Sequence, residues 1–119
     1  MSGYFQLKEF ACKCKRCKGS LNVGPGIHPK LLEVLNAIRS EVGIPIVINS
    51  GYRCPEHNAE VGGSPKSQHV EGTAADIRWK DMDVDDAALI ADYCGADGIG
   101  VYSTFVHVDV RGVKARWRG

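Results

Sequence analysis

Three polar side chains that lie far apart in the sequence constrain the fold of this chain most. His69 and Asp76 stand seven positions apart in the stretch Ser67–Asp76, with Gly72 and small residues between them. A second imidazole, His107, follows 31 positions after Asp76. Two imidazoles and one carboxylate form a ligand set for a divalent metal such as zinc. Three protein ligands leave a fourth position for water, which is typical of catalytic zinc sites.

The run from 105 to 111 alternates valines with polar residues and predicts a strand. Its valines point to one face of a sheet and are expected to pack on the core. Its other face carries His107, Asp109 and Arg111, which would meet a cleft or solvent. An edge strand that turns polar residues outward is the alternative. The placement favoured by the pattern brings His107 to the His–Asp pair upstream.

Length and composition indicate one globular domain over residues 1–119. The net charge of +1 gives no electrostatic reason to expect binding to nucleic acid or to an acidic membrane. No apolar run approaches the roughly 18 residues of a membrane helix, and the N-terminus lacks the hydrophobic region of a signal peptide. We therefore expect a chain that is made in the cytoplasm and has no membrane span. The sequence does not determine its oligomeric state, for which a monomer is the favoured expectation.

Apolar periodicity and helix breakers predict the other elements. Apolar residues at helical spacing begin after Pro29 and stop at Gly43, which suits a helix start and a helix end. An edge segment or a short turn is expected over 4–11 and a loop over 62–68, with His69 at the end of that loop. The expected helices cover 29–42, 55–61 and 83–94, and the expected strands cover 44–49, 74–79, 98–102 and 105–111.

The chain has five cysteines, and an odd number without a secretion signal argues against a full disulfide framework. Cys12, Cys14 and Cys17 lie within six residues. They would hold a structural metal only with a fourth ligand from elsewhere, such as Cys54 or a histidine. The paired C-x-x-C spacing of a zinc ribbon is missing, so the pattern favours free thiols or one adventitious disulfide.

Two strings of residues resemble the zinc D-Ala-D-Ala carboxypeptidases and related peptidoglycan peptidases of the M15 group, most closely its short phage- and prophage-associated branch. The strings are Ser67-x-His69-x-x-Gly72-x-Ala74-x-Asp76 and His107-x-Asp109, and Ser50-Gly51-Tyr52-Arg53 and His57-Asn58 are also similar to that family. The resemblance covers about residues 5–112. It implies an α+β fold, a small hedgehog/D-Ala-D-Ala-peptidase-like domain with a central, mostly antiparallel sheet and packed helices.

The resemblance also implies roles for particular residues. His69, Asp76 and His107 would be the zinc ligands. Ser67 would support the ligand loop by hydrogen bonding, and Gly72 would permit the turn between the ligands.

Arg53 resembles the arginine that contacts the substrate near the reacting group. It would hold a peptide carboxylate or stabilise a tetrahedral oxyanion, and an ordinary surface arginine is the alternative. Many members of the family carry a general base three residues before the last ligand, where this chain has Thr104. Asp109 is the substitute candidate, either as the base or as a carboxylate that orients the ligand imidazole. Glu71 is a weaker third candidate.

The implied function is a zinc-dependent metallopeptidase that hydrolyses a peptide bond in peptidoglycan stem or cross-link peptides, as a carboxypeptidase or an endolysin-like endopeptidase. Such a chain would reach the cell wall after release or export by another route. Two alternatives remain open. One is a non-catalytic zinc-binding module that recognises cell-wall peptide, and the other is a small zinc-stabilised interaction or DNA-binding domain built on Cys12, Cys14 and Cys17.

Overall fold

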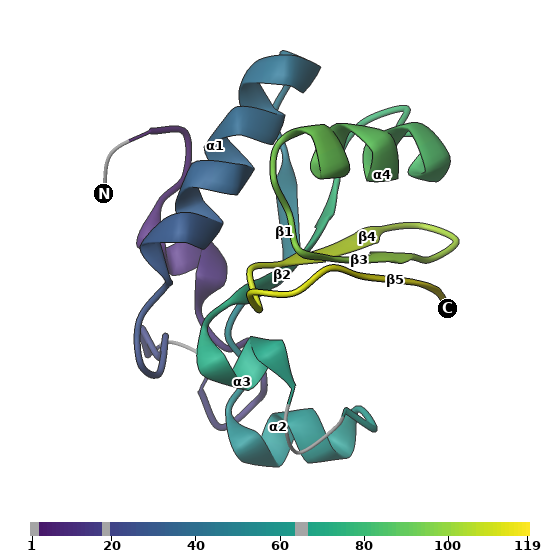
Figure 1. The fold of residues 1–119 in the computed structure, drawn as a ribbon. Helices are drawn as coiled ribbons and strands as arrows, with labels where there is room; N and C mark the ends of the chain where they lie inside the picture. The colour runs from purple at the N-terminus through teal and green to yellow at the C-terminus, as the bar shows by residue number, and fades with distance from the viewer. Residues whose placement is uncertain (1–2, 18–19, 64–66) are drawn as a thin grey trace.

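A computed structural model describes residues 3–17, 20–63 and 67–119. Residues 64–66, in the middle of the expected loop over 62–68, lie outside the described residues. The fold is α+β: a five-stranded, mostly antiparallel sheet has α1 and α4 on one side and α2 and α3 on the other (Figure 1). The elements are η1 Leu7–Phe10, α1 Pro29–Val42, β1 Val47–Ser50, α2 Pro55–Glu60, α3 Gln68–Glu71, β2 Ala74–Arg78, α4 Val84–Tyr93, β3 Gly98–Val101, β4 Val106–Asp109 and β5 Ala115–Arg118.

Helix α1 has the bounds that its sequence predicts. Pro29 occupies the first turn, and the side chain of His28 caps the helix by accepting a hydrogen bond from the backbone N–H of Lys30. Gly43 ends the helix in the left-handed conformation, with φ of 76°. Leu31, Val34, Leu35 and Ile38 are the buried residues of its apolar face.

The strand order is β1-β2-β4-β3-β5, and β5 pairs parallel to β3 while the other pairs are antiparallel. The register places Asp76 of β2 directly opposite His107 of β4. On the other side of β4, His107 faces Gly100 of β3, which in turn pairs with Trp117 of β5. One row across the sheet therefore carries an acid, an imidazole, a glycine and an indole.

The two faces of the sheet have different chemistry because side chains alternate along each strand. The face under α1 and α4 is apolar and forms the core with these helices. The opposite face carries the polar residues of β2 and β4 toward α3. The core includes Leu31, Leu35, Ile38, Ile48, Ala75, Ile77, Ala87, Ala91, Ile99, Val106 and Val108.

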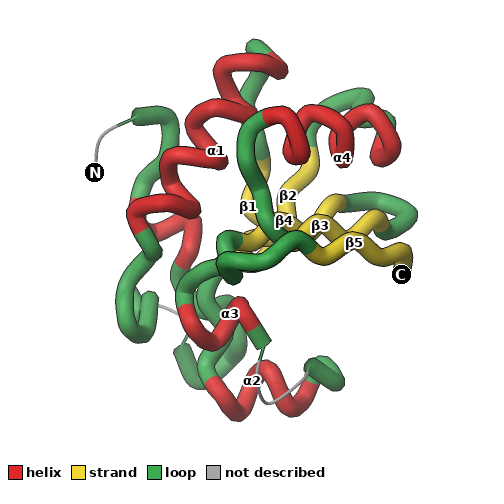
Figure 2. The backbone as a smooth tube through the Cα atoms, in the orientation of Figure 1, coloured by secondary structure: helices red, strands yellow, loops and turns green. Residues whose placement is uncertain are grey.

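Several elements differ from the sequence predictions (Figure 2). The strand expected over 44–49 begins only at Val47, and the expected loop before His69 ends in the short helix α3. Strand β5 was not predicted at all. The polar face of β4 is also more buried than expected, since the Asp109 side chain is inaccessible to solvent. None of the helices in the described residues is long and apolar enough to cross a membrane.

Candidate metal centre

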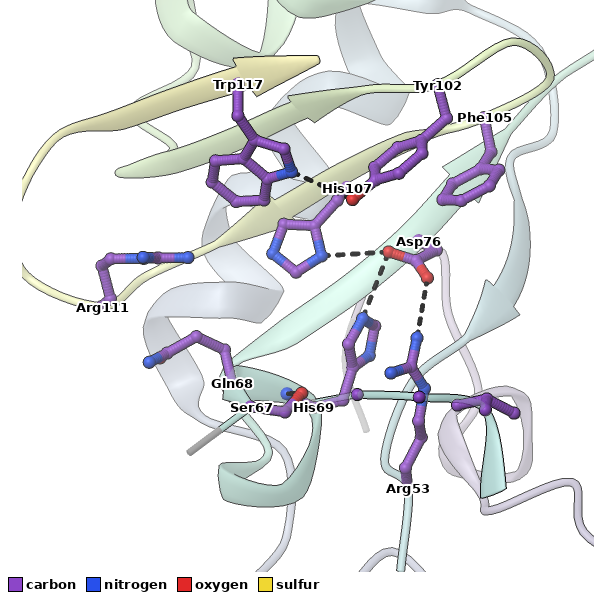
Figure 3. A pocket seen from close by; sticks show the side chains of 13 residues that line it. Arg53, Ser67, Gln68, His69, Asp76, Tyr102, Phe105, His107, Arg111 and Trp117 are labelled. Carbon is purple, nitrogen blue, oxygen red and sulfur yellow. Dashed lines mark hydrogen bonds and ion pairs between the residues drawn. The ribbon is translucent and has the colours of Figure 1, made fainter. Parts of the chain in front are cut away.

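His69, Asp76 and His107 converge on one point although they come from three elements. His69 lies on α3, Asp76 on β2 and His107 on β4 (Figure 3). Asp76 Oδ1 lies 3.2 Å from His69 Nε2 and 3.0 Å from His107 Nδ1. All three side chains are buried, and one potential ligand atom from each lies within 4.8 Å of the others. The structure thus brings together the trio that the sequence predicted as ligands.

The local structure of α3 points His69 at this site. Ser67 caps the helix by accepting a hydrogen bond from the backbone N–H of His69 at 3.2 Å. Gly72 ends it in the left-handed conformation, where an added Cβ would lie 2.2 Å from the carbonyl oxygen of Gly26. His69 Nδ1 lies 2.8 Å from the carbonyl oxygen of Gly51. Because a carbonyl only accepts hydrogen bonds, Nδ1 donates its proton to Gly51, and in the neutral ring the lone pair that a metal ion would use is on Nε2.

His107 is oriented by a second carboxylate behind it. Its Nε2 lies 2.8 Å from Asp109 Oδ2, while its Nδ1 faces Asp76. Asp109 itself is held by the backbone N–H of Gly98 at 3.1 Å and by Arg111 Nη2 at 2.7 Å. When Nε2 donates its proton to Asp109, Nδ1 is left with a free lone pair. This carboxylate–histidine arrangement is the usual support of a metal-binding histidine.

The electrostatics of the site favour a cation. Burial alone would raise the pKa of the Asp76 carboxyl, but hydrogen bonds with His107 and His69 outweigh burial and hold that pKa well below its usual range. Burial also opposes a charge on His107, yet its hydrogen bonds to Asp109 and Asp76 raise its pKa above the ordinary value. An imidazole between two ionised carboxylates therefore binds either a proton or, through Nδ1, a metal ion.

Arg53 stands beside the trio rather than on the open surface. Its Nη2 donates to Asp76 Oδ2 at 3.3 Å, its Nε to Ser50 Oγ at 3.2 Å and its Nη1 to Asn58 Oδ1 at 3.3 Å. These bonds engage three of the five N–H donors of the guanidinium. Its backbone N–H donates to the carbonyl oxygen of His69 at 3.3 Å. Arg53 thus fixes the second oxygen of Asp76 and also lines the cavity over the trio.

The trio lies in a cavity of about 520 Å³, a size typical of small-ligand sites. Tyr102 and Phe105 stack with ring centres 4.5 Å apart, and Trp117 donates its indole N–H to the Tyr102 hydroxyl at 2.9 Å. The guanidinium of Arg111 lies 5.1 Å from the centre of the Trp117 ring. The cavity therefore has an aromatic side and two cationic groups. The polar residues lining it include Arg53, Ser67, Gln68 and Arg111.

The sequence-based candidates for a general base lie in different places. Asp109 is inaccessible to solvent and bonded to His107, Gly98 and Arg111. Thr104 and Glu71 are exposed and do not line the cavity. Of the two roles considered for Asp109, its position matches a carboxylate that orients the ligand imidazole.

The aromatic side of the cavity was missed by the sequence analysis. Trp117 lies on β5, whose four residues alternate charged and apolar side chains. That alternation was the available signal, but four residues rich in arginine do not stand out as a strand. The sequence predicts Tyr102 and Phe105 at the ends of neighbouring strands, and only the turn between β3 and β4 brings their rings together.

The donor set fits a small divalent metal ion. Ligands at about 2.0–2.2 Å from a tetrahedral ion lie about 3.3 Å from one another. Asp76 Oδ1 lies 3.2 Å from His69 Nε2 and 3.0 Å from His107 Nδ1. The remote nitrogen of each imidazole is tied back by the protein. Mixed nitrogen and oxygen ligands are typical of zinc and related ions. Within the described residues, the arrangement therefore provides three ligands at the base of an open cavity.

Two comparisons with known proteins bear on this site. A search of curated proteins finds no match. The family model described as Peptidase M15 matches residues 3–109, which include the whole trio, Arg53 and Asp109. The resemblance to the M15 group is thus confirmed, and this chain belongs to the Peptidase M15 family.

Proposed function

We propose that this chain is a zinc-dependent peptidase that hydrolyses a peptide bond in peptidoglycan stem or cross-link peptides. The observation that carries the proposal is the trio His69, Asp76 and His107 at the base of the cavity, with the remote nitrogen of each imidazole bonded to the protein. Membership of the Peptidase M15 family supports a peptide as the substrate.

The residues of the chain have separable roles in this proposal. His69, Asp76 and His107 would hold the zinc ion, which when bound supplies Lewis acidity for a peptide carbonyl and for a nucleophilic water. Asp109 keeps the proton of His107 on Nε2, so that Nδ1 stays available as a ligand. The carbonyl oxygen of Gly51 accepts the Nδ1 proton of His69, so that Nε2 of this ring stays available as a ligand.

The walls of the cavity would bind and orient the peptide. Arg53 is anchored by Ser50, Asn58 and Asp76, so its guanidinium has a fixed direction and would recognise a peptide carboxylate or a developing oxyanion. Trp117 and its aromatic neighbours offer a flat apolar surface that would exclude water from one side of the bound peptide.

The direct test is incubation of the zinc-loaded protein with purified muropeptides, followed by mass spectrometry of the products. The proposal predicts fragments that have gained one water at a peptide bond. His69→Ala should abolish their release, whereas His57→Ala, outside the trio, should not. If zinc-loaded wild-type protein releases no fragment from any muropeptide or D-Ala-D-Ala peptide, the enzymatic proposal is wrong.

Asp109→Asn separates orientation of a ligand from proton transfer. As a positioning residue, Asp109 should affect zinc affinity, which we expect to fall about 10–100-fold in the variant. Turnover at saturating zinc should be retained to a large extent. An unchanged zinc affinity with complete loss of turnover would instead assign Asp109 as the base.

One observation favours a second function. Among the described residues that line the cavity, Asp76 is the only carboxylate, and its two oxygens already face the imidazoles and Arg53. A module that binds cell-wall peptide without cleaving it would have such a cavity. It predicts saturable muropeptide binding by calorimetry with no product in the same sample.

A further inference from the structure

Four cysteines form a second buried cluster, separate from the trio of the metal centre. Cys12, Cys14 and Cys17 come from the segment after η1, and Cys54 directly precedes α2. All four side chains are buried, and their Sγ atoms all lie within 4.8 Å of one another. The sequence left the fourth partner of the first three undecided, and the fold supplies Cys54.

The spacing of the sulfur atoms matches a metal site better than disulfides. Cys14 Sγ lies 3.7 Å from Cys12 Sγ and 3.8 Å from Cys54 Sγ. Four thiolates at about 2.3 Å from a tetrahedral zinc ion would be about 3.8 Å apart. A disulfide needs about 2.05 Å. One sulfur therefore has two neighbours at the edge length of a zinc tetrahedron, and none of the four is in a disulfide.

The surroundings suit negatively charged sulfur. The side-chain amide of Asn22 donates to Cys17 Sγ at 3.2 Å, and the backbone N–H of Cys54 donates to Cys12 Sγ at 3.4 Å. Hydrogen bonds of this kind stabilise thiolates around a metal. The basic residues Lys13, Lys15 and Arg16 alternate with the cysteines in the sequence. The positive charges of the two lysines would offset part of the net negative charge of a divalent ion with four thiolates, whereas Arg16 already pairs with Glu60.

We propose that Cys12, Cys14, Cys17 and Cys54 bind a structural zinc ion. Four thiolates select zinc or another thiophilic ion over magnesium or calcium. With four protein ligands the coordination shell is closed, so this ion would have no position for a substrate. The proposal is independent of peptide hydrolysis, because none of its ligands belongs to the trio.

The ion would link the N-terminal segment to residues 51–54, which support the candidate metal centre. Cys54 directly follows Arg53, and the carbonyl of Gly51 holds His69. The backbone N–H of Tyr52 donates to the carbonyl oxygen of Phe10 at 2.8 Å, which joins the same two segments a few residues away. A bound ion adds a covalent-like tie between them, so its binding free energy becomes stability of the folded chain.

The test isolates the cysteine cluster by removing the other site. The double variant His69→Ala/His107→Ala, expressed with zinc and purified without chelators, should retain about one zinc ion per chain by elemental analysis. Replacing zinc by Co²⁺ in this variant should produce intense thiolate-to-cobalt charge-transfer absorption in the near ultraviolet. Removing the ion with a strong chelator should lower the melting temperature of the variant.

Single-cysteine variants of the same protein assign the ligands. Cys14→Ser should lose the zinc and the cobalt absorption, and Cys94→Ser, the matched control outside the cluster, should keep both. The proposal is overturned if the folded double variant contains no zinc or if its cobalt form lacks the charge-transfer band. It is also overturned if the mass of the double variant is lower than that of the fully reduced chain by two hydrogens per disulfide, because the cysteines are then oxidised. These measurements on the double variant decide the matter even if Cys14→Ser fails to fold.

Discussion

His107 is the residue on which the metal centre depends most closely. Its ring lies between two carboxylates, with Asp76 at Nδ1 and Asp109 at Nε2. Only the contact with Asp76 involves a proposed ligand, and Asp109 lies behind the ring with no exposure to solvent. Asp109, with Gly98 and Arg111 that hold it, therefore determines which nitrogen of the His107 ring is left to bind a metal ion.

Asp109 should also give the metal-free protein a characteristic acid sensitivity. Burial would raise the pKa of its carboxyl, but hydrogen bonds with His107 and Arg111 outweigh burial and hold the pKa below its usual range. A carboxyl with a lowered folded-state pKa contributes stability above its unfolded pKa of about 4, and this contribution is lost as the pH falls toward the folded value. Asp109→Asn should therefore cost about 1–3 kcal/mol at neutral pH, and less below about pH 4.

Urea unfolding of the metal-free wild type and variant across this pH range measures the difference. Asp92→Asn is a suitable control, because Asp92 is a half-exposed carboxylate that pairs with Arg116 on the surface and should change stability little. A difference for Asp109→Asn that stays constant from neutral pH to below pH 4 would mean that its charge does not contribute.

At the scale of elements, strands β3 and β5 decide the shape of the cavity. Gly100 of β3 pairs with Trp117 of β5, and a Cβ at Gly100 would lie 2.4 Å from the indole Nε1. The indole can lie beside His107, with ring centres 5.1 Å apart and ring planes tilted by 49°, only because position 100 has no side chain. Gly98 likewise leaves room for the Asp109 side chain, because a Cβ added at Gly98 would lie 2.2 Å from Asp109 Oδ2.

This close approach predicts energetic coupling between Gly100 and Trp117. Gly100→Ala should destabilise the protein by about 1–3 kcal/mol, because the indole must move from its place. In a Trp117→Ala background the same change should cost much less. A double-mutant cycle by urea unfolding gives the coupling energy, and additive effects of the two substitutions would show that the contact is unimportant.

The elements that the sequence predicted are those with strong local signals. Pro29 and Gly43 bracket α1, and the alternation around His107 marks β4. The missed elements lack such signals: α3 has only four residues, and β5 pairs with β3 through contacts distant in the sequence. The convergence of His69, Asp76 and His107 could be predicted because their residue types and a family resemblance agreed.

The positions of supporting groups could not be predicted in the same way. Nothing local to Asp109 distinguishes a carboxylate in a cleft from one behind the histidine, because that depends on the register of β3 against β4. Cys54 is 37 positions from Cys17, and only the tertiary fold brings it to the other three thiols. Long-range packing therefore decides the roles that the sequence left open.

At the scale of the whole molecule, the sheet separates stability from chemistry. Its face under α1 and α4 (Figure 1) packs on the apolar core, and its other face carries Asp76 and His107 toward His69 of α3. The segment from 50 to 54 lies between the two proposed metal sites, with Gly51 and Arg53 at the trio and Cys54 at the cysteine cluster. This short segment thus joins the N-terminal part of the chain to the cavity, alongside the hydrogen bond from the backbone N–H of His28 to the carbonyl oxygen of Gly72.

The most direct test of the account is a crystal structure of the zinc-loaded protein, with anomalous diffraction measured on both sides of the zinc absorption edge. We predict a zinc peak bonded to His69 Nε2, Asp76 and His107 Nδ1, with Asp109 still bonded to His107 Nε2. Absence of a peak at the trio, or coordination through His107 Nε2 with Asp109 released, would contradict it.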